Sequence, residues 1–256
     1  MQSHCGRYIM VYNGEVYNYK EIAKKLGNIN WKTKSDTEVI LEAFAKWNSD
    51  FVNELNGMFA IAIYDNLNNK LYLFRDRMGI KPLYYYIDSK EFIFSSELKA
   101  INIIKKEKQI NHDALYSYLH LGYIPSDQTI YHNTFKLNPG AFLTYEKNKI
   151  SKKFYWKTKN KISNNTNENY NSSKKELQSL LKESIKKRLI SDVPIGTFLS
   201  GGTDSSIVTA IAQEVNNSPI NTFSIGFKEA KYNESRYAKK VAKHLGTNHH
   251  EFILSE

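Results

Sequence analysis

Cysteine is almost absent from this chain, and long apolar runs are absent altogether. Cys5 is the single cysteine among 256 residues, so no disulfide can form within the chain, and a reducing compartment is the simplest setting. No run of about 18 apolar residues occurs, which argues against a membrane-spanning helix. Residues 1–7 lack the hydrophobic core of a secretion signal. We therefore expect a cytoplasmic protein with no membrane partner.

Negative charge is also in short supply, because 36 Lys and Arg residues face 26 Asp and Glu residues, for a net charge of +10. Such a surplus can indicate nucleic-acid binding. Here, however, the positive residues are mostly lysines dispersed among Asn, Ile and Tyr, and the densest cluster, residues 186–188, occupies one turn of an amphipathic helix. We therefore expect no nucleic-acid partner. Hydrophobic residues at 41% are sufficient for buried cores and exclude a wholly disordered chain.

The first 150 residues alternate between short strand patterns and helix patterns. Asn13-Gly14 is a strong turn dipeptide and predicts a turn directly after the first strand. Strands are predicted at 8–12, 58–65, 70–75, 83–87, 92–95 and 141–145, the last strand of this half. Helices are predicted at 19–26, from residue 35 or 36 onward, and at 113–121.

The composition then changes, because residues 157–173 are polar and nearly free of apolar side chains, as in a linker. A helix with spaced leucines follows between 177 and 189. Strands at 194–199, 220–227 and 249–254 then alternate with helices at 205–215 and 234–245. This β-α-β-α-β order predicts a doubly wound parallel sheet. Three strands are few for such a domain, so we expect the chain to be cut off at Glu256, as at Met1.

The sharpest motif is FLSGGTDSS at residues 198–206. Gly201 and Gly202 allow close backbone approach to a ligand, and backbone N–H groups at a helix start form an anion site. The hydroxyls of Ser200, Ser205 and Ser206 can add donors, whereas Asp204 suits a bridging Mg²⁺. No Gly-Lys-Ser/Thr follows, so this is not a Walker A loop. A capped turn between strand and helix is the plain alternative.

This loop resembles the pyrophosphate loop of the ATP pyrophosphatases, which split ATP into AMP and pyrophosphate while they adenylate a substrate. The flanking segments RLISDVPIG (188–196), TFSIGF (222–227), YNES (232–235) and LGTNHH (245–250) resemble glutamine-dependent asparagine synthetases. The resemblance implies that Asp204 holds Mg²⁺ and that Ile225 lies near the adenine. It also implies a set of residues around the ATP phosphates: Leu199, Ser200, Gly201, Gly202, Asp204, Ser205 and Ser206.

The second informative stretch is YNGEVYN at residues 12–18. A side-chain amide beside a glycine N–H can form an oxyanion hole, although a hairpin turn is the plain alternative. Segments 35–38, 55–60, 74–85, 95–100 and 136–140 follow in the order found in the N-terminal-nucleophile glutaminase domain, which these segments resemble. The resemblance implies an incomplete αββα sandwich in which Asn13 and Gly14 bind glutamine through an oxyanion hole. Glu15 and Asp36 would hold the α-amino group of glutamine.

The resemblance also has gaps. The family's nucleophilic cysteine and the arginine for the glutamine carboxylate would precede this sequence, and Cys5 does not match the nucleophile. The later ATP-binding segment and the aspartate pocket would follow Glu256. We therefore expect a fragment with three parts: a partial glutaminase domain (1–150), a linker (151–173) and the first part of an ATP-binding domain (174–256). Arg75, Asp76 and Arg77 are expected to be structural.

The resemblance implies a ligase that uses glutamine, aspartate and ATP, and it leaves a homodimer open. Aspartate would be adenylated, and ammonia from glutamine would displace AMP to give asparagine. Two alternatives stay open: a related amidotransferase with another acceptor, such as a cell-surface sugar, and an inactive remnant that binds nucleotide. The glutaminase-like residues disfavour a β-lactam-forming relative, which needs no glutamine.

Overall fold

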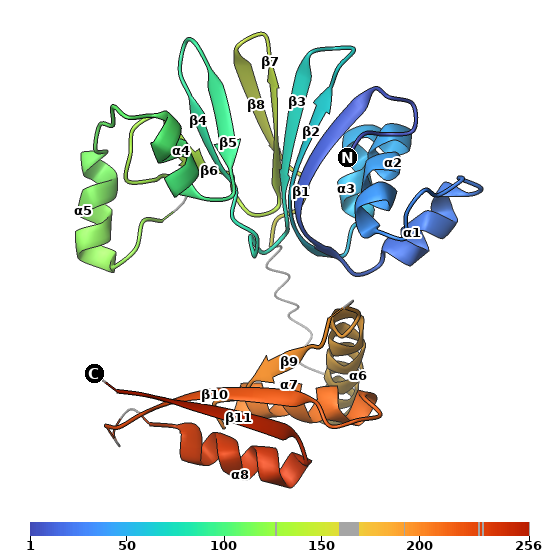
Figure 1. Ribbon diagram of the computed structural model, residues 1–256, viewed down its shortest axis with the longest axis vertical. Coiled ribbons are helices and arrows are strands. Elements are labelled where there is room, and N and C mark those ends of the chain that lie inside the picture. Colours follow the sequence, from blue (N-terminus) through green and yellow to red (C-terminus); the bar gives the residue numbers. More distant parts are fainter. Residues whose placement is uncertain (126, 159–168, 192, 230, 232, 256) are drawn as a thin grey trace. The chain divides into compact units, whose positions relative to one another are not determined.

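The computed structural model describes residues 1–125, 127–158, 169–191, 193–229, 231 and 233–255. The chain divides into two compact units, Met1–Asn160 and Lys161–Glu256 (Figure 1). Asp192 and Tyr232, which belong to two of the family-like segments, lie outside the described residues, as does most of the expected linker.

The first unit is built around two antiparallel sheets. The larger sheet has the order β1-β2-β3-β7-β8 and the smaller one the order β5-β4-β6. The strands of the larger sheet are β1 (Tyr8–Val16), β2 (Gly57–Asp65), β3 (Lys70–Arg75), β7 (Ala141–Glu146) and β8 (Lys149–Phe154). Those of the smaller sheet are β4 (Tyr84–Ile87), β5 (Phe92–Ser95) and β6 (Thr134–Lys136). Alternation of side chains across these strands gives the larger sheet two apolar faces.

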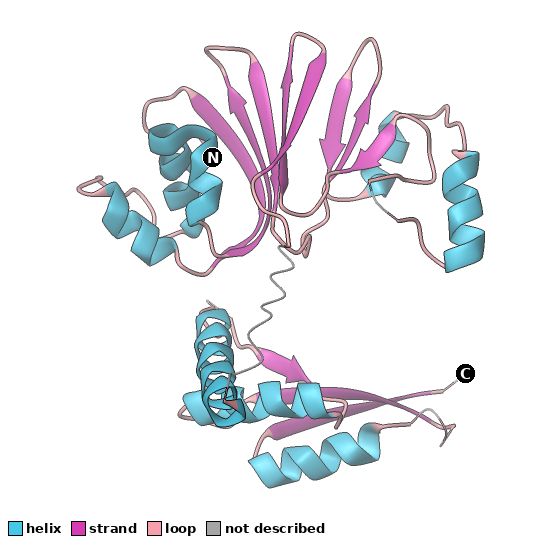
Figure 2. Cartoon of the chain, turned by 180° about the vertical axis from the view of Figure 1, so that it is seen from behind, coloured by secondary structure: helices cyan, strands magenta, loops and turns pink. Residues whose placement is uncertain are grey.

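Helices cover the outer faces of the two sheets, as Figure 2 shows for this unit. The segments α1 (Tyr19–Leu26), α2 (Asp36–Trp47), η1 (Asn48–Asp50) and α3 (Phe51–Glu54) pack on one face of the larger sheet. Phe44 on α2 lies at the centre of this core, with its ring 5.1 Å from Tyr8 and 5.4 Å from Phe51. Helix α4 (Leu98–Ile104) packs against β4 and β5, and α5 (His112–Leu121) follows it.

The opposite face of the larger sheet meets the smaller sheet in a second core, which includes Ala60, Leu73, Tyr85 and Leu143. The layer order is therefore helix, sheet, sheet, helix. This is the αββα sandwich expected from the sequence.

The second unit contains a parallel sheet in the order β11-β10-β9. Its elements are α6 (Tyr170–Arg188), β9 (Gly196–Phe198), α7 (Thr203–Val215), β10 (Asn221–Phe227), α8 (Ser235–Leu245) and β11 (Asn248–Leu254). The β-α-β-α-β order of the prediction is confirmed. Two small clusters hold the helices, one around Ile185 and Ala212 and the other around Leu199 and Ala238.

The predicted turn at Asn13-Gly14 is wrong. Strand β1 runs through both residues, and Gly14 pairs with Phe59 on β2. A Cβ atom at Gly14 would lie 2.2 Å from the carbonyl oxygen of Met58. Glycine is needed here because a neighbouring strand comes close, which a turn-based interpretation of the dipeptide misses.

The prediction that residues 141–145 form the last strand is also wrong. Strand β8 follows across a two-residue turn in which Lys147 and Asn148 both have positive φ, at 50° and 59°. All six residues of β8 are exposed. Because neither face of this strand is buried, its sequence does not need the alternation of apolar and polar residues by which a half-buried strand is predicted. Since α6 begins at Tyr170, both ends of the expected linker 151–173 carry regular structure.

Among the described residues, no helix has both the length and the apolar character needed to cross a membrane.

Candidate functional site

A pocket of about 240 Å³ lies beside Asn13 in the first unit. Its lining comes from β1, β2, the end of β5 and Leu83, which directly precedes β4: Val11, Tyr12, Asn13, Ala60, Ala62, Leu83, Phe94, Ser95 and Ser96. The Asn13 amide nitrogen donates a hydrogen bond to the Ser96 hydroxyl at 3.3 Å. A second amide hydrogen remains for a ligand, because a side-chain amide carries two donors.

The backbone N–H of Gly14 points away from β2, toward the outer side of β1. On the same side, Met10 N–H donates to the carbonyl of Met1 at 2.8 Å, and Val16 N–H donates to Asp36 Oδ2 at 3.0 Å. Gly14 is an even number of residues from both Met10 and Val16, so its N–H points in the same direction as theirs. Strand β1 is an edge strand of the described sheet. The Asn13 amide and the Gly14 N–H are therefore two donors on adjacent residues at one sheet edge.

Asp36 is held at the start of α2 and joins this edge. Its Oδ2 accepts from the Tyr12 hydroxyl at 2.7 Å as well as from Val16 N–H. Burial and the Asp36 carboxylate both raise the pKa of Tyr12, so the phenol stays a neutral donor. Glu15 lies on β1, one residue before Val16, on the same strand face as Asn13. The structure thus places Asp36 beside Tyr12 and Val16 at the end of β1, whereas the Glu15 side chain points to the opposite face of the strand from Tyr12.

Asp76 braces the strand that faces Gly14. Its buried carboxylate accepts the N–H groups of Phe59, Met78, Ile80 and Lys81 at 2.9–3.2 Å. The neighbouring Arg75 guanidinium donates to two carbonyls of the same loop and to the Leu137 carbonyl between β6 and β7. Burial lowers the pKa of Arg75. These contacts support the structural role expected for both residues.

In the second unit, the loop between β9 and α7 is tied together by its own hydroxyls. The Ser200 and Ser205 hydroxyls lie 2.9 Å apart, and Ser200 N–H donates to Ser205 Oγ at 3.3 Å. Gly202 N–H donates to Ser200 Oγ at 3.3 Å. Helix α7 begins at Thr203, so its first N–H groups open toward this loop.

Gly201 is fixed by its conformation and by its neighbours. Its φ is +84°, and a Cβ atom would lie 2.6 Å from the backbone of Tyr237 and Ala238. Gly202 differs, because its Cβ would meet only Ser200 Oγ, at 3.4 Å. The loop is therefore seated against the first turn of α8 through Gly201.

Asp204 and Ser206 lie in the first turn of α7. Asp204 is exposed at the helix start. The Ser206 hydroxyl is buried and has no hydrogen-bond partner among the described residues. Within the described residues, no group of three or more His, Cys, Asp or Glu side chains is placed to hold a metal. One exposed carboxylate can still contribute to Mg²⁺ binding, because Mg²⁺ retains waters and substrate oxygens as its other ligands.

Leu199 and Ile225 differ in what they offer to a ligand. The Leu199 side chain is 1% exposed and packs under α8 with Ala238 and Ala242, so only its backbone faces the loop. Ile225 is 53% exposed near the carboxyl end of β10. Leu199 N–H donates to Phe223 O at 2.8 Å, which places the loop beside this end of the sheet, where α/β folds bind ligands.

Two contributors to the first site, Tyr12 and Ser96, were not predicted as site residues. Tyr12 directly precedes Asn13, and Ser96 directly follows β5. Their roles depend on contacts with Asp36, 24 positions away, and with Asn13, 83 positions away. A pattern within one strand contains no signal for such distant partners.

Comparisons with known proteins agree with this two-part arrangement. Residues 1–156 match the family model "Glutamine amidotransferase domain", and residues 176–256 match the model "Asparagine synthase". "Putative asparagine synthetase [glutamine-hydrolyzing] 2" of Methanocaldococcus jannaschii is 44% identical over 256 residues, which cover 97% of this chain and 48% of that protein. "Asparagine synthetase [glutamine-hydrolyzing] 3" of Bacillus subtilis is 33% identical over 267 residues, with 97% and 43% covered.

A solved structure of glutamine phosphoribosylpyrophosphate amidotransferase from B. subtilis covers the whole chain at 13% identity. Its TM-score of 0.48 is too low to support a conclusion. The chain spans about half the length of the curated relatives it matches. The model over residues 1–156 covers more than half of the chain, so the chain belongs to the glutamine amidotransferase family, and its residues 176–256 are similar to asparagine synthases.

Proposed function

We propose that this polypeptide takes part in glutamine-dependent asparagine synthesis, in which ATP activates aspartate and ammonia from glutamine displaces AMP. The loop of residues 200–206 is the observation that carries the proposal. It lies between strand β9 and the start of helix α7. Gly201 packs closely against α8, and the hydroxyls of Ser200 and Ser205 contact each other across the loop. Family membership and the Asn13–Gly14 edge support the glutamine half of the reaction.

In the glutamine half, a nucleophile, which is a cysteine in the family that the chain resembles, would attack the side-chain carbonyl carbon of glutamine. The resulting tetrahedral intermediate carries negative charge on the former carbonyl oxygen. The second amide hydrogen of Asn13 and the backbone N–H of Gly14 are the donors that would stabilise this oxygen. Glu15 and Asp36 would attract the α-ammonium of glutamine. Asp36 Oδ1 accepts long hydrogen bonds from the hydroxyls of Ser35 at 3.4 Å and Thr37 at 3.3 Å, and an ammonium would compete with these two donors.

In the synthetase half, the loop would hold the β- and γ-phosphates of ATP while pyrophosphate departs. Free N–H groups at the start of α7 and the hydroxyls of Ser200, Ser205 and Ser206 would donate to the phosphate oxygens. The buried, unpartnered Ser206 hydroxyl has an unsatisfied hydrogen-bonding capacity that such a ligand would use. Asp204 would hold Mg²⁺, which neutralises phosphate charge when bound. Ile225 would contact the adenine.

The cytoplasmic location and the homodimer remain predictions. Cell fractionation and light scattering are their respective tests.

The test of the proposed function starts with binding to the whole chain. Pyrophosphate with Mg²⁺, and then ATP with Mg²⁺, are titrated while the amide NMR signals are followed. We expect shifts at residues 200–206 and 225. Shifts that spare this loop would refute the ATP half of the proposal.

The glutamine half has its own readout in the same sample. Titration with glutamine should shift the signals of Asn13, Gly14 and Ser96, and Asn13→Ala should abolish these shifts. An assay for AMP and pyrophosphate release that depends on glutamine and aspartate follows. Release that depends on a different acceptor would assign the chain to a related amidotransferase.

A further inference from the structure

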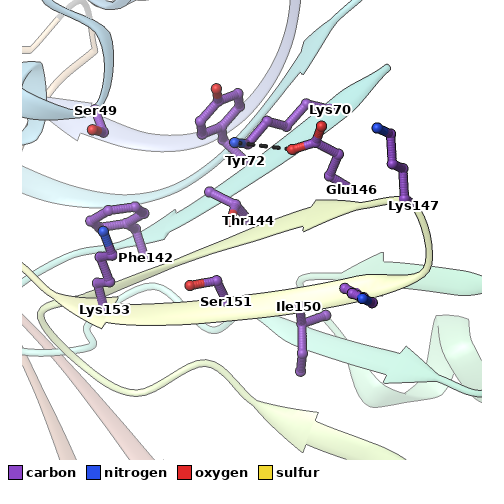
Figure 3. Close-up of a pocket in the computed structure, with 11 residues that line it drawn as sticks. Ser49, Lys70, Tyr72, Phe142, Thr144, Glu146, Lys147, Ile150, Ser151 and Lys153 are labelled. Atoms are coloured by element: carbon purple, nitrogen blue, oxygen red, sulfur yellow. Dashed lines mark ion pairs between the residues drawn. The ribbon is translucent and has the colours of Figure 1, made fainter. Parts of the chain in front are cut away.

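An open pocket of about 660 Å³ lies on the first unit, on the sheet face that also carries α2, away from the Asn13 pocket. Strands β3, β7 and β8 form its floor, and Ser49 of η1 contributes to its wall (Figure 3). The lining is Ser49, Lys70, Tyr72, Phe142, Thr144, Glu146, Lys147, Lys149, Ile150, Ser151 and Lys153. No part of the proposed reaction uses these residues.

Strand register explains why these side chains meet. Tyr72 on β3 pairs with Thr144 on β7, which in turn pairs with Ser151 on β8. This row places three hydroxyl-bearing side chains across the floor of the pocket. Two residues further along the strands in one direction, Phe142 pairs with Lys153, and two residues further in the other direction Glu146 pairs with Lys149. Residues of one row point to the same face of a sheet.

The pocket has a surplus of positive charge. Four lysines line it against one acid, Glu146, which makes +4 − 1, or +3. Glu146 forms an ion pair with Lys70 at 3.3 Å, drawn as the dashed line in Figure 3. Among the described residues, Lys147, Lys149 and Lys153 form no ion pair. Three lysines of the lining thus have no acidic partner among the described residues.

We propose that this pocket binds a small ligand that carries two or more phosphate groups. Lysine is a common phosphate ligand in proteins and acts as a point charge. A multivalent anion matches a surplus of three charges better than a monoanion does. The hydroxyls of Tyr72, Thr144 and Ser151 supply donors for phosphate oxygens. The exposed parts of the Tyr72 and Phe142 rings would contact an organic group attached to the phosphates.

Lysines on an exposed edge strand have another use, which is to prevent pairing with other chains. Strand β8 provides an internal comparison, because Lys152 lies on its opposite face. The Lys152 ammonium contacts Asp127 at 2.6 Å and the Asn138 side chain at 2.9 Å. Within the described part of the chain, Lys149 and Lys153, on the pocket face of the same strand, have no such partner. Lys70 and Ser49 come from other elements. Protection of the edge strand does not explain why residues of β3 and η1 line the same pocket.

The test uses the whole chain and sodium tripolyphosphate without Mg²⁺. Amide NMR shifts should appear on β7 and β8, including Thr144 and Ser151. The double variant Lys149→Gln/Lys153→Gln should weaken this binding at least tenfold. The matched control Lys152→Gln removes one charge from the other face and should change it less than twofold. Shifts in the loop 200–206 form a separate set of signals, so failure here and failure of the proposed function are distinguishable.

Three outcomes would overturn the proposal. Tripolyphosphate shifts confined to other parts of the chain would remove the site. Equal weakening by Lys152→Gln and by the double variant would indicate a diffuse charge effect. Tighter binding of a single-stranded oligonucleotide than of tripolyphosphate, with the same sensitivity to the double variant, would replace the small ligand by a nucleic acid. Tryptophan fluorescence of each variant reports whether the first unit is folded, because Trp31, Trp47 and Trp156 all belong to it.

Discussion

Single residues with many backbone partners hold the first site in place. Asp76 is the clearest case, because one buried carboxylate accepts four backbone N–H groups from β2 and from the loop after β3. One of those groups belongs to Phe59, the strand partner of Gly14. The position of Gly14, the proposed oxyanion donor, therefore depends on a carboxylate that is itself held by backbone N–H groups.

Asp76→Asn tests this bracing role. The amide group of asparagine would place an N–H donor against backbone donors, so two of the four hydrogen bonds are lost inside a buried site. We expect the first unit to lose about 3 kcal/mol of stability, measured by urea unfolding with tryptophan fluorescence. The exposed Asp113→Asn on α5 is the control, with a change below about 0.5 kcal/mol. A loss as small as that at Asp76 would mean that its hydrogen bonds contribute little.

Glu38 gives the protein a defined response to acid. Burial alone would raise the pKa of Glu38, but hydrogen bonds from Lys32, Thr33 and His4 together lower it to about 2. A carboxyl group whose folded pKa lies below its unfolded value of about 4.5 stabilises the fold above that value. This stabilisation disappears as the pH falls from about 5 toward 2.

Glu38→Gln should therefore lower the stability of the first unit by about 2 kcal/mol at pH 7. Its urea midpoint should also change less with pH between 5 and 2 than that of the unaltered chain. Some dependence should remain, because Arg7 lowers the pKa of Asp65 to about 2. Parallel curves for the two chains over this range would contradict the assigned role of Glu38.

At the scale of elements, the loop between β9 and α7 contains its own matched pair of variants. Gly201→Ala would force a Cβ to within 2.6 Å of the α8 backbone at a φ of +84°, whereas Gly202→Ala meets only a hydroxyl at 3.4 Å. We expect Gly201→Ala to weaken pyrophosphate binding at least tenfold and Gly202→Ala to weaken it much less. Calorimetry with Mg²⁺ and pyrophosphate measures both. Equal affinities of the two variants for pyrophosphate would show that the packing of Gly201 against α8 does not determine the geometry of the binding loop.

The elements that sequence predicts well are those with local signals. Helix α2 begins where Ser35 suggests, since the Ser35 hydroxyl accepts from Thr37 N–H at 3.2 Å. The parallel order of β9, β10 and β11 follows from alternating strand and helix patterns. Strand β8 was not predicted, because all its residues are exposed and exposed and buried positions do not alternate along it. In addition, the turn before it is Lys147-Asn148, which is not the usual Asn-Gly pair. Asn13-Gly14 misled for the opposite reason, since a turn-like dipeptide lies inside a strand.

Only those parts of the two sites that lie within a continuous sequence motif were predictable. The loop 200–206 forms at the predicted strand–helix junction, but the burial of Leu199 depends on α8, which begins 36 positions later at Ser235. The contact of Tyr12 with Asp36 likewise depends on how α2 packs against β1. Contacts between distant segments are set by packing, and one sequence without a structure holds no local signal for them.

At the scale of the whole chain, the two units differ in how much apolar surface they bury. The first has a core of 17 buried residues around Phe44 and a second of eight around Leu73. Among its described residues, the second unit has two clusters of three buried residues each. One face of its sheet is exposed, with Phe198 at 81%, Phe252 at 60% and Ile225 at 53%. Since buried apolar area is the main source of stability, the second unit should be the weaker one.

This difference predicts two separate unfolding transitions in urea. Because all three tryptophans belong to the first unit, fluorescence should report only the later transition, while circular dichroism should report both. Mg²⁺ with pyrophosphate should shift the earlier transition to higher urea, because a ligand that binds only the folded loop stabilises it. Asp76→Asn should shift the later one alone. A single transition with coincident fluorescence and dichroism curves would show instead that the two units unfold together, and the small clusters of the second unit would then be stabilised by contacts beyond its own core.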